Sequence, residues 1–547
     1  MKTFRYALIV MAGILTGTMC FAQTTQTAEV ANIKVQVQLD QPGRQIPPSF
    51  LGLSVEYSQI QDLTSPGYGH QAALINLVNN IQQFNGPFVF RIGGNSTDRT
   101  FWEGLPDTTP HFNNTPINTK NAANKNATTQ TANANADQAG QGANRRKTAI
   151  VLTPVLIHNL QGLAAGTNCK FILGLNMACD NPNVPLVWAK EAIAGLGRSI
   201  MAFEIGNEPS LYAKNGYRHK GYSLADYFKD YQNYVNAIRP VLPDGIQIAG
   251  GAYCCGWLES TDKFIDNEHQ NVNIVTVHLY PLSGISPRPR PNPDEGENPA
   301  DNPNLPSRKP TIPNLLKNTS STMYVTRGAA FLTAAAKFNL PVRWAEMNSA
   351  NGGGNAATSG SFAAALWAVD TLFEIYHSGA VGVNFHMGAN YPTFDWVDEN
   401  KLDVCPLYYG QLFFAQAVQN HARLIPVSFQ TSANVKIWAT LDANHVLRVV
   451  VINKDLKQDA QITLHLPTNR QAELETLFAP DMTARTGLVI YGGGKIINYD
   501  HTINGNPGPV DMDQPYPLNQ YVIPQDGVFS FSAPHIQAKM LIVQLPE

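Results

Sequence analysis

The sequence predicts an α/β fold: a (β/α)₈ barrel of the TIM type with an additional antiparallel β-sandwich. First, its 547 residues exceed what one simple core normally uses. Second, from residue 50 to about 420, short β-rich apolar runs alternate with helix-like segments, as in parallel βα units. Third, after about residue 423 apolar and polar residues alternate, which is typical of antiparallel sheets.

Eight runs in the first region are almost continuously hydrophobic, which fits strands that are buried on both faces. They lie at 50–57, 87–94, 169–176, 200–207, 246–253, 272–280, 341–348 and 380–387. Helix-like segments lie at 68–84, 185–196, 224–239, 322–338, 360–378 and 407–419. Eight strands with intervening helices are the number that closes a (β/α)₈ barrel.

The sandwich strands are expected in the alternating runs 434–441, 445–453, 460–466, 528–533 and 538–545. The run at 33–39 alternates in the same way and is expected to join them. We therefore assign residues 1–22 to a signal peptide, 46–422 to the barrel, and 30–45 plus 423–547 to the sandwich domain.

The first residues have the pattern of a signal peptide. Lys2 and Arg5 precede the apolar run 7–15, and small residues stand at the cleavage positions before Gln23. The apolar run is too short to cross a bilayer. We therefore expect an exported protein, periplasmic or secreted, that is not inserted in a membrane.

Charge and cysteine content exclude several kinds of partner. The formal net charge of −3 is mild for this length, and no basic stripe indicates nucleic acid. The cysteines beyond the signal show no metal-binding spacing, so we predict no metal and no cofactor. Export permits disulfides, but an odd number of cysteines leaves at least one thiol unpaired in a monomer. These five are Cys169, Cys179, Cys254, Cys255 and Cys405.

Two segments interrupt the barrel pattern. Residues 116–144 are polar, with Ile117 as their single large apolar residue, and cannot bury enough surface to offset their ordering entropy. Residues 287–313 contain nine prolines and are expected to be extended, without helix or sheet. Both follow even-numbered strands and so emerge on the carboxyl-end face of the barrel. They are either insertions without a role or a substrate lid.

Two glutamates stand at the ends of buried strands. Glu208 lies in an Asn-Glu-Pro motif after the fourth strand, and Glu346 lies near the end of the seventh, before a glycine run at 352–354. Because the carboxyl ends of the strands form the active face of this barrel, the two carboxyl groups should converge. Such a pair can divide a hydrolysis between a proton donor and a nucleophile. The pattern indicates a glycoside hydrolase.

These motifs resemble those of a known family. The Asn-Glu-Pro motif at 207–209 and the run 346–354 are similar to glycoside hydrolase family 79, the clan A group of β-glucuronidases and heparanases. The similarity extends from about Leu51 to Tyr409 and includes the Gly-Gly-x-x-x-Asp stretch within 90–98. The resemblance implies a retaining, exo-acting β-glucuronidase whose substrate is a glucuronic-acid-containing glycoside or oligosaccharide.

The resemblance also implies roles for individual residues. Glu208 would be the general acid/base and Glu346 the nucleophile. Asn207 would hydrogen-bond the sugar 2-hydroxyl, a contact that strengthens in the oxocarbenium-like transition state. Glu56 and Asp98 match positions that bind the other ring hydroxyls, since each carboxylate can accept two hydrogen bonds.

Gly352, Gly353 and Tyr408 match the positions that hold the uronate in this family. Glycine N–H groups can approach an anion closely and point together at it. Asn351 stands where heparanase has a tyrosine, so contacts beyond the first sugar are expected to differ.

Three further residues are candidates for the site: Tyr280 for binding the substrate, and Arg91 and His278 for supporting the catalytic pair. Arg91 and Tyr280 are expected to favour the anion of Glu346, although Arg91 is equally suited to a structural pair with Glu204. His278 shares one face of its strand with Tyr280 by the period of two. His278 is either part of the site or a satisfied core histidine.

Other functions stay open at this point. The alternatives within enzymes are another clan A retaining hydrolase, such as a β-xylosidase or arabinofuranosidase, and a heparanase-like endo-glucuronidase. The glycine run and Tyr408 argue against neutral-sugar hydrolases, because such enzymes need no anion site. A carbohydrate-binding protein without turnover is the non-enzymatic alternative, and it has no need of a paired acid and nucleophile.

Overall fold

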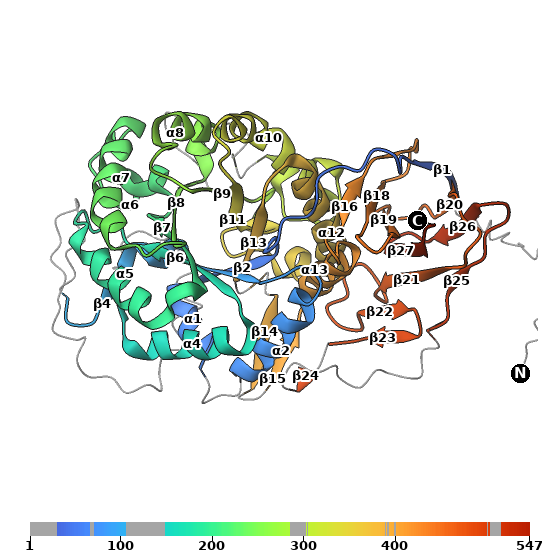
Figure 1. The fold of residues 1–547 in the computed structure, drawn as a ribbon, viewed down its shortest axis with the longest axis horizontal. Coiled ribbons are helices and arrows are strands. Elements are labelled where there is room, and N and C mark those ends of the chain that lie inside the picture. Colours follow the sequence, from blue (N-terminus) through green and yellow to red (C-terminus); the bar gives the residue numbers. More distant parts are fainter. Residues whose placement is uncertain are drawn as a thin grey trace, which may run out of the picture.

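The computed structural model describes residues 30–65, 70–105, 148–284, 302, 305–388, 390, 393–398, 401–499, 502–503 and 516–546. A closed barrel of parallel strands lies at the left of Figure 1, and the β-sheets of the C-terminal part lie at the right. The predicted fold class, a TIM barrel with an additional sandwich, is confirmed. The proposed signal peptide and the insertion 116–144 lie outside the described residues. Among the helices described, none is long and apolar enough to cross a membrane.

Each of the eight predicted barrel strands is present, and neighbouring strands pair in parallel. The closed order is β11-β13-β2-β3-β6-β7-β8-β9. The strands are β2 (Gly52–Glu56), β3 (Val89–Gly93), β6 (Lys170–Leu175), β7 (Ile200–Ile205), β8 (Gln247–Tyr253), β9 (Ile274–Leu279), β11 (Val342–Met347) and β13 (Gly382–His386). Nearly all of their residues are buried, which explains why the runs read as continuously hydrophobic.

Helices surround the barrel. The six predicted ones correspond to α2 (His70–Gln82), α5 (Asn183–Leu196), α7 (Leu224–Ile238), α10 (Asn318–Lys337), α12 (Phe362–Ser378) and α13 (Pro406–Ala417). The structure adds α1 (Tyr57–Leu63), α4 (Pro154–Thr167), α6 (Tyr212–Asn215), α8 (Thr261–Glu268), α9 (Ile312–Leu315) and α11 (Ala356–Ser359).

The prediction that 287–313 contains no helix is wrong at its C-terminal end. The 3₁₀ helix η9 (Pro306–Arg308) and the helix α9 both lie there. Each has a proline at the start of its first turn, where the missing N–H costs no intrahelical hydrogen bond. Proline at these positions initiates a helix rather than excluding one.

The C-terminal part contains two packed sheets. One follows the antiparallel order β16-β18-β19-β27-β21-β22-β23, with bounds β16 (Arg423–Ile425), β18 (Val435–Leu441), β19 (Val446–Asn453), β27 (Gln537–Gln544), β21 (Ala472–Phe478), β22 (Val489–Gly492) and β23 (Lys495–Ile497). The other has the order β17-β1-β20-β26, with bounds β17 (Val427–Ser428), β1 (Ala31–Val37), β20 (Ala460–His465) and β26 (Val528–Ala533). Apolar side chains from both sheets form one core.

The N-terminal strand belongs to this C-terminal part. β1 lies between β17 and β20, and in Figure 1 it is the blue strand among the red ones. Its pairing with β20 is parallel, so the second sheet is not purely antiparallel as expected. Ile33 and Val35 of β1 are buried in the sandwich core, which fits the alternation seen in the sequence.

α12 joins the barrel to the sandwich. Its residues Phe362 to Tyr376 are all buried, because barrel elements cover one side and sandwich strands the other. Phe373 stacks on Trp438 of β18, with ring centroids 5.4 Å apart. The buried Asp370 pairs with Lys454 at 2.6 Å. The two parts therefore share an interface with both apolar and charged contacts.

Candidate active site

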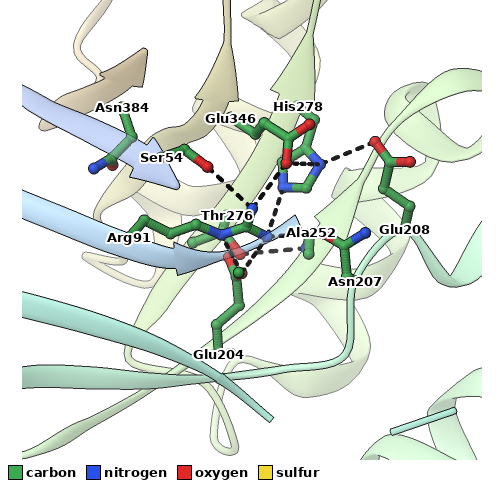
Figure 2. Close-up of polar contacts among 12 residues, drawn as sticks. Ser54, Arg91, Glu204, Asn207, Glu208, Ala252, Thr276, His278, Glu346 and Asn384 are labelled. Atoms are coloured by element: carbon green, nitrogen blue, oxygen red, sulfur yellow. Dashed lines mark hydrogen bonds and ion pairs between the residues drawn. The ribbon is translucent and has the colours of Figure 1, made fainter. Parts of the chain in front are cut away.

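Arg91 is the centre of a buried polar network at the carboxyl end of the barrel (Figure 2). Its Nε donates to Glu204 Oε2 at 2.7 Å, its Nη1 to Glu346 Oε2 at 2.8 Å and its Nη2 to Asn207 Oδ1 at 2.9 Å. Both sequence interpretations of Arg91 therefore describe real contacts. A Cβ at Gly93 would lie 2.6 Å from the guanidinium, so glycine is needed there to make room for it.

Glu346 lies in β11 and is held as an anion. Its Oε2 accepts from Arg91, and its Oε1 accepts from the Tyr280 hydroxyl at 2.8 Å. His386 Nδ1 and His278 Nδ1 lie 3.7 and 4.0 Å from Oε2. Burial alone would raise the pKa of Glu346, but His386, His278 and Arg91, together with the Tyr280 hydrogen bond, lower it to about 2. The carboxylate is thus ionised at neutral pH.

Glu208 stands just beyond β7 in a left-handed backbone conformation, with φ 47° and ψ 55°. A residue other than glycine in this region costs energy and commonly marks a functional site. Its N–H donates to Ala252 O at 3.2 Å, which ties the turn to β8. Its Oε1 lies 3.1 Å from His278 Nδ1.

His278 connects the two ends of this network. Arg91 Nη2 lies 3.4 Å from His278 Nε2, and arginine can only donate. In the neutral ring Nε2 is therefore the acceptor, and the proton is on Nδ1, which donates to Glu208 Oε1. This arrangement leaves Oε2 of Glu208 as the atom that can carry a proton.

The two candidate catalytic carboxyl groups are close together. One oxygen of Glu208, one of Glu346 and a ring nitrogen of His278 all lie within 4.8 Å of one another. Carboxyl groups stand roughly 5–5.5 Å apart in retaining glycosidases and roughly 6.5–9.5 Å apart in inverting ones. The short distance between the Glu208 and Glu346 oxygens favours the retaining geometry.

The same three residues offer ligand atoms to a metal ion. Arg91 already neutralises Glu346 at 2.8 Å, and its positive charge opposes that of a bound cation. The group therefore fits an acid–nucleophile pair better than a metal site.

The residues expected to bind ring hydroxyls lie on the same face. Glu56 ends β2, and its carboxylate accepts from the N–H groups of Asn95 at 3.0 Å and Ser96 at 2.7 Å. Both belong to the 3₁₀ helix η2 (Gly94–Arg99), which also contains Asp98. Asp98 is buried and accepts a hydrogen bond from Tyr212 Oη at 2.8 Å. Sugar binding by Glu56 and Asp98 stays a prediction.

The sequence did not single out His386 and Ser54. Ser54 Oγ lies 3.0 Å from His386 Nδ1 and accepts from Arg91 Nη1 at 3.2 Å. His386 Nε2 lies 3.8 Å from Glu56 Oε1, so the histidine stands between Glu56 and Glu346. No motif marks these residues. The available signal was the position of His386 at the end of the eighth predicted strand.

The glycine run follows a short pair of strands at this face. β12 (Ala350–Asn351) pairs in parallel with β10 (Leu282–Ser283). Gly352, Gly353 and Gly354 then have φ values of 64°, 88° and 80°, a conformation that favours glycine. Within the described residues, the N–H groups of Gly352 and Gly353 have no hydrogen-bond acceptor. They are suited to an anion from outside the chain.

The prediction that Tyr408 completes this anion site is wrong. Tyr408 belongs to α13, its side chain is fully buried, and its hydroxyl donates to Leu77 O of α2 at 2.9 Å. Its ring packs against Phe394 and Tyr499, with centroid distances of 5.5 Å. α13 is buried on all sides, so the hydroxyl finds its acceptor in a neighbouring helix rather than in the site.

No protein-family model matches the chain, and no curated protein matches it.

Solved structures do share its fold. A 4-O-α-L-rhamnosyl-β-D-glucuronidase from Fusarium oxysporum 12S, in complex with Rha-GlcA, superposes with a TM-score of 0.66 at 16% identity, over 94% of this chain and 100% of the other. The GH51 arabinofuranosidase from Xanthomonas axonopodis pv. citri has a TM-score of 0.63 at 14% identity, with the same coverage. The GH51 α-L-arabinofuranosidase from Thermotoga petrophila RKU-1 has a TM-score of 0.61 at 12% identity, again over 94% and 100%. The chain thus has the two-part fold of these glycoside hydrolases along almost its entire length.

Proposed function

We propose that this protein is a retaining, exo-acting β-glucuronidase that hydrolyses glucuronides by double displacement. The approach of the Glu208 and Glu346 carboxyl groups to within 4.8 Å, at the carboxyl ends of barrel strands, carries the proposal.

The surroundings of the two glutamates support different roles in this mechanism. Glu346 is surrounded by donors and its pKa is lowered to about 2, so it is available as the nucleophile that attacks the anomeric carbon. Glu208 accepts from His278 at one oxygen and can hold a proton at the other. It would protonate the glycosidic oxygen as the bond breaks, and later take a proton from water as the glycosyl–enzyme ester is hydrolysed. Two inversions give net retention.

Arg91 and Asn207 would act on the transition state. Arg91 donates to Oδ1 of Asn207 at 2.9 Å. The other side-chain atom of Asn207, Nδ2, would then be free to donate to the sugar 2-hydroxyl. Because Arg91 also holds Glu346, one cation sets the positions of the nucleophile and of the group that recognises the sugar. Preorganised donors of this kind need no rearrangement during the reaction.

The uronate specificity rests on the glycine run. The N–H groups of Gly352 and Gly353 have no acceptor within the described residues, and successive N–H groups in a turn conformation can form an anion site. The β-D-glucuronidase with the same fold supports this substrate class. The residues Glu56 and Asp98 would bind the other ring hydroxyls.

The alternative is an arabinofuranosidase, because several solved structures with the same fold carry that activity. A neutral furanoside gives the Gly352 and Gly353 amides no anion to bind. Turnover of p-nitrophenyl β-D-glucuronide, β-D-glucoside, β-D-xyloside and α-L-arabinofuranoside separates the two proposals.

We expect the glucuronide to be preferred over the glucoside by on the order of 10-fold or more, because hydrogen bonds to a charged group contribute roughly 1.5–3 kcal/mol each before desolvation. The first-formed sugar should be the β-anomer by NMR. Equal kcat/KM on glucuronide and glucoside would refute the anion site, and preferred hydrolysis of the arabinofuranoside would select the alternative. Binding without turnover of any substrate would indicate a carbohydrate-binding protein.

A further inference from the structure

Two adjacent cysteines stand at the edge of the candidate site. Cys254 and Cys255 follow β8 at the carboxyl end of the barrel, and their Sγ atoms lie 2.8 Å apart. Cys254 is buried, whereas Cys255 is partly exposed. Cys255 has a φ of 53°, a left-handed conformation that residues other than glycine adopt only where the surrounding structure imposes it. The backbone therefore directs the two sulfurs toward each other.

The same turn contacts the loop that carries Glu208. The Glu208 N–H donates to Ala252 O at 3.2 Å, and Ser210 Oγ donates to Cys254 O at 3.4 Å. Ser210 Oγ also lies 3.8 Å from Cys254 Sγ. Burial, the neighbouring Cys255 thiol and the charge of Glu208 raise the pKa of the Cys254 thiol well above its usual value. The end of β8 thus contacts Glu208 directly, and the turn after β8 contacts the Glu208 loop through Ser210.

The turn borders the side on which the leaving group departs. In double displacement the acid/base protonates the oxygen that joins the sugar to its aglycone, so the aglycone lies on the Glu208 side. The partly exposed Trp257, two residues beyond Cys255, stacks on Tyr222 with ring centroids 6.2 Å apart. The turn thus lies beside the Glu208 loop, on the side where an aglycone would depart.

We propose that Cys254 and Cys255 form a vicinal disulfide, a modification site that holds the turn after β8 against Glu208 at the leaving-group edge of the site. The disulfide itself does not depend on the proposed function, but its effect on turnover rests on it. A disulfide bond is about 2.05 Å long, so the sulfurs, now 2.8 Å apart, need to approach by less than about 1 Å. Because the Cα atoms of neighbouring residues are about 3.8 Å apart, closer than in most disulfides, the bond would also strain the turn.

The oxidant is a disulfide, of protein or of small-molecule type, which the compartment reached by an exported chain would supply. The more exposed Cys255 attacks it as the thiolate, forms a mixed disulfide and releases one thiol. Cys254 then attacks the Cys255 sulfur and releases the second thiol. Two protein thiols are oxidised, one external disulfide is reduced, and the two thiol protons leave with the released thiols.

Mass spectrometry of the full chain tests the modification directly. The protein is treated with oxidised glutathione, unfolded, alkylated with iodoacetamide and digested. We expect the peptide that contains Cys254 and Cys255 to be unlabelled and lighter by two hydrogens, and to gain two labels after reduction. The Cys169→Ala variant is the matched control and should give the same peptide. Labelling of both cysteines in the oxidised protein, or a cross-link from either to another cysteine, would overturn the proposal.

Kinetics test the effect on the site. The substrate is a β-glucuronide with a large aglycone. We expect reduction by dithiothreitol to change its kcat/KM by roughly tenfold. This is less than the ~10²-fold loss that a 1 Å displacement of the reacting groups themselves can cause. The change should be smaller with a p-nitrophenyl aglycone and absent in the Cys254→Ala/Cys255→Ala variant. Equal kcat/KM with and without reductant would refute the role of the turn, even where the disulfide forms. If no glucuronide is hydrolysed, the proposed function fails, and the peptide mass still decides whether the disulfide exists.

Discussion

At the scale of single residues, the buried cation Arg91 organises the candidate site. It bonds Glu204, Glu346 and Asn207 at once and lies beside His278. A buried charge with this many partners is costly to disturb, because removing one partner leaves the others uncompensated. The roles of the individual glutamates can therefore be tested best by substitutions that keep their shape.

Glu346→Gln should abolish turnover of every glycoside, because an amide cannot form the covalent intermediate. The measurement is kcat/KM on p-nitrophenyl β-glucuronide. Glu191→Gln is the matched control, since Glu191 is an exposed glutamate of α5, and it should leave kcat/KM unchanged. Substantial activity in Glu346→Gln would assign the nucleophile elsewhere.

Glu208→Ala should lose roughly 10²–10⁴-fold in kcat/KM on a substrate with a poor leaving group. The loss should be much smaller when the leaving group is good, because such a group departs without protonation. Added azide should restore part of the rate by trapping the glycosyl–enzyme. The two roles would be reversed by two results together. Azide would rescue Glu346→Ala with retention of configuration, and the loss of kcat/KM in Glu208→Ala would not depend on the leaving group.

Tyr280→Phe should move the acidic limb of the pH profile. The Tyr280 hydroxyl donates to Glu346 Oε1 and contributes to the lowered pKa of that carboxyl. A lowered pKa means that the folded protein stabilises the Glu346 anion. This stabilisation is fully present above pH 4.5, the ordinary pKa of a glutamate, and is lost as the pH falls toward about 2. Without the hydrogen bond we expect the limb in kcat/KM to shift upward by about 1 pH unit. An unchanged limb would show that the hydroxyl does not act on Glu346.

At the scale of elements, the strands were easier to predict than the helices and the orientation of side chains. The eight barrel strands are buried on both faces, so their composition alone marks them. α4 contains Gly162 and Gly166, which lower helix propensity, and it was missed.

Candidate site residues could be named from the sequence where a motif accompanied them. Glu208 and Glu346 stand in motifs at strand ends, whereas His386 and Ser54 enter the site only through pairing across strands that are distant in sequence. Tyr408 failed for a different reason. A residue pattern places a tyrosine on a helix, but only the packing around α13 decides which acceptor its hydroxyl reaches.

Gly353→Ala tests the loop after β12. The Gly353 φ of 88° is strained for alanine by roughly 1–2 kcal/mol, so the loop should reorient and turn its N–H groups away from the uronate. We expect the ratio of kcat/KM for glucuronide over glucoside to fall on the order of 10-fold. Gly245→Ala is the control: it has a φ of 89° and open space around its Cβ, in the loop before β8. An equal ratio in Gly353→Ala and wild type would contradict the anion site.

At the scale of the whole molecule, barrel and sandwich share the buried pair of Asp370 and Lys454. Lys454→Met should leave the Asp370 carboxylate buried without its partner, at a cost of roughly 3–5 kcal/mol, and so lower Tm. Lys457→Met, at an exposed neighbouring position, is the control and should leave Tm nearly unchanged. Differential scanning calorimetry measures both, and equal Tm values would show that the pair adds nothing to stability.

The place of β1 has a consequence for the order in which a newly made chain can assemble. Translation delivers β1 first, while its partners β17 and β20 come from Val427–Ser428 and Ala460–His465, after the whole barrel. Until those residues leave the ribosome, the backbone groups of β1 have no sheet to join, and an unpaired strand of alternating apolar residues invites association with other chains. β1 is therefore synthesised early but can pair only after β17 and β20 have been made. A nascent chain that stops within the barrel would expose β1, whose two edges are paired with β17 and β20 in the finished protein.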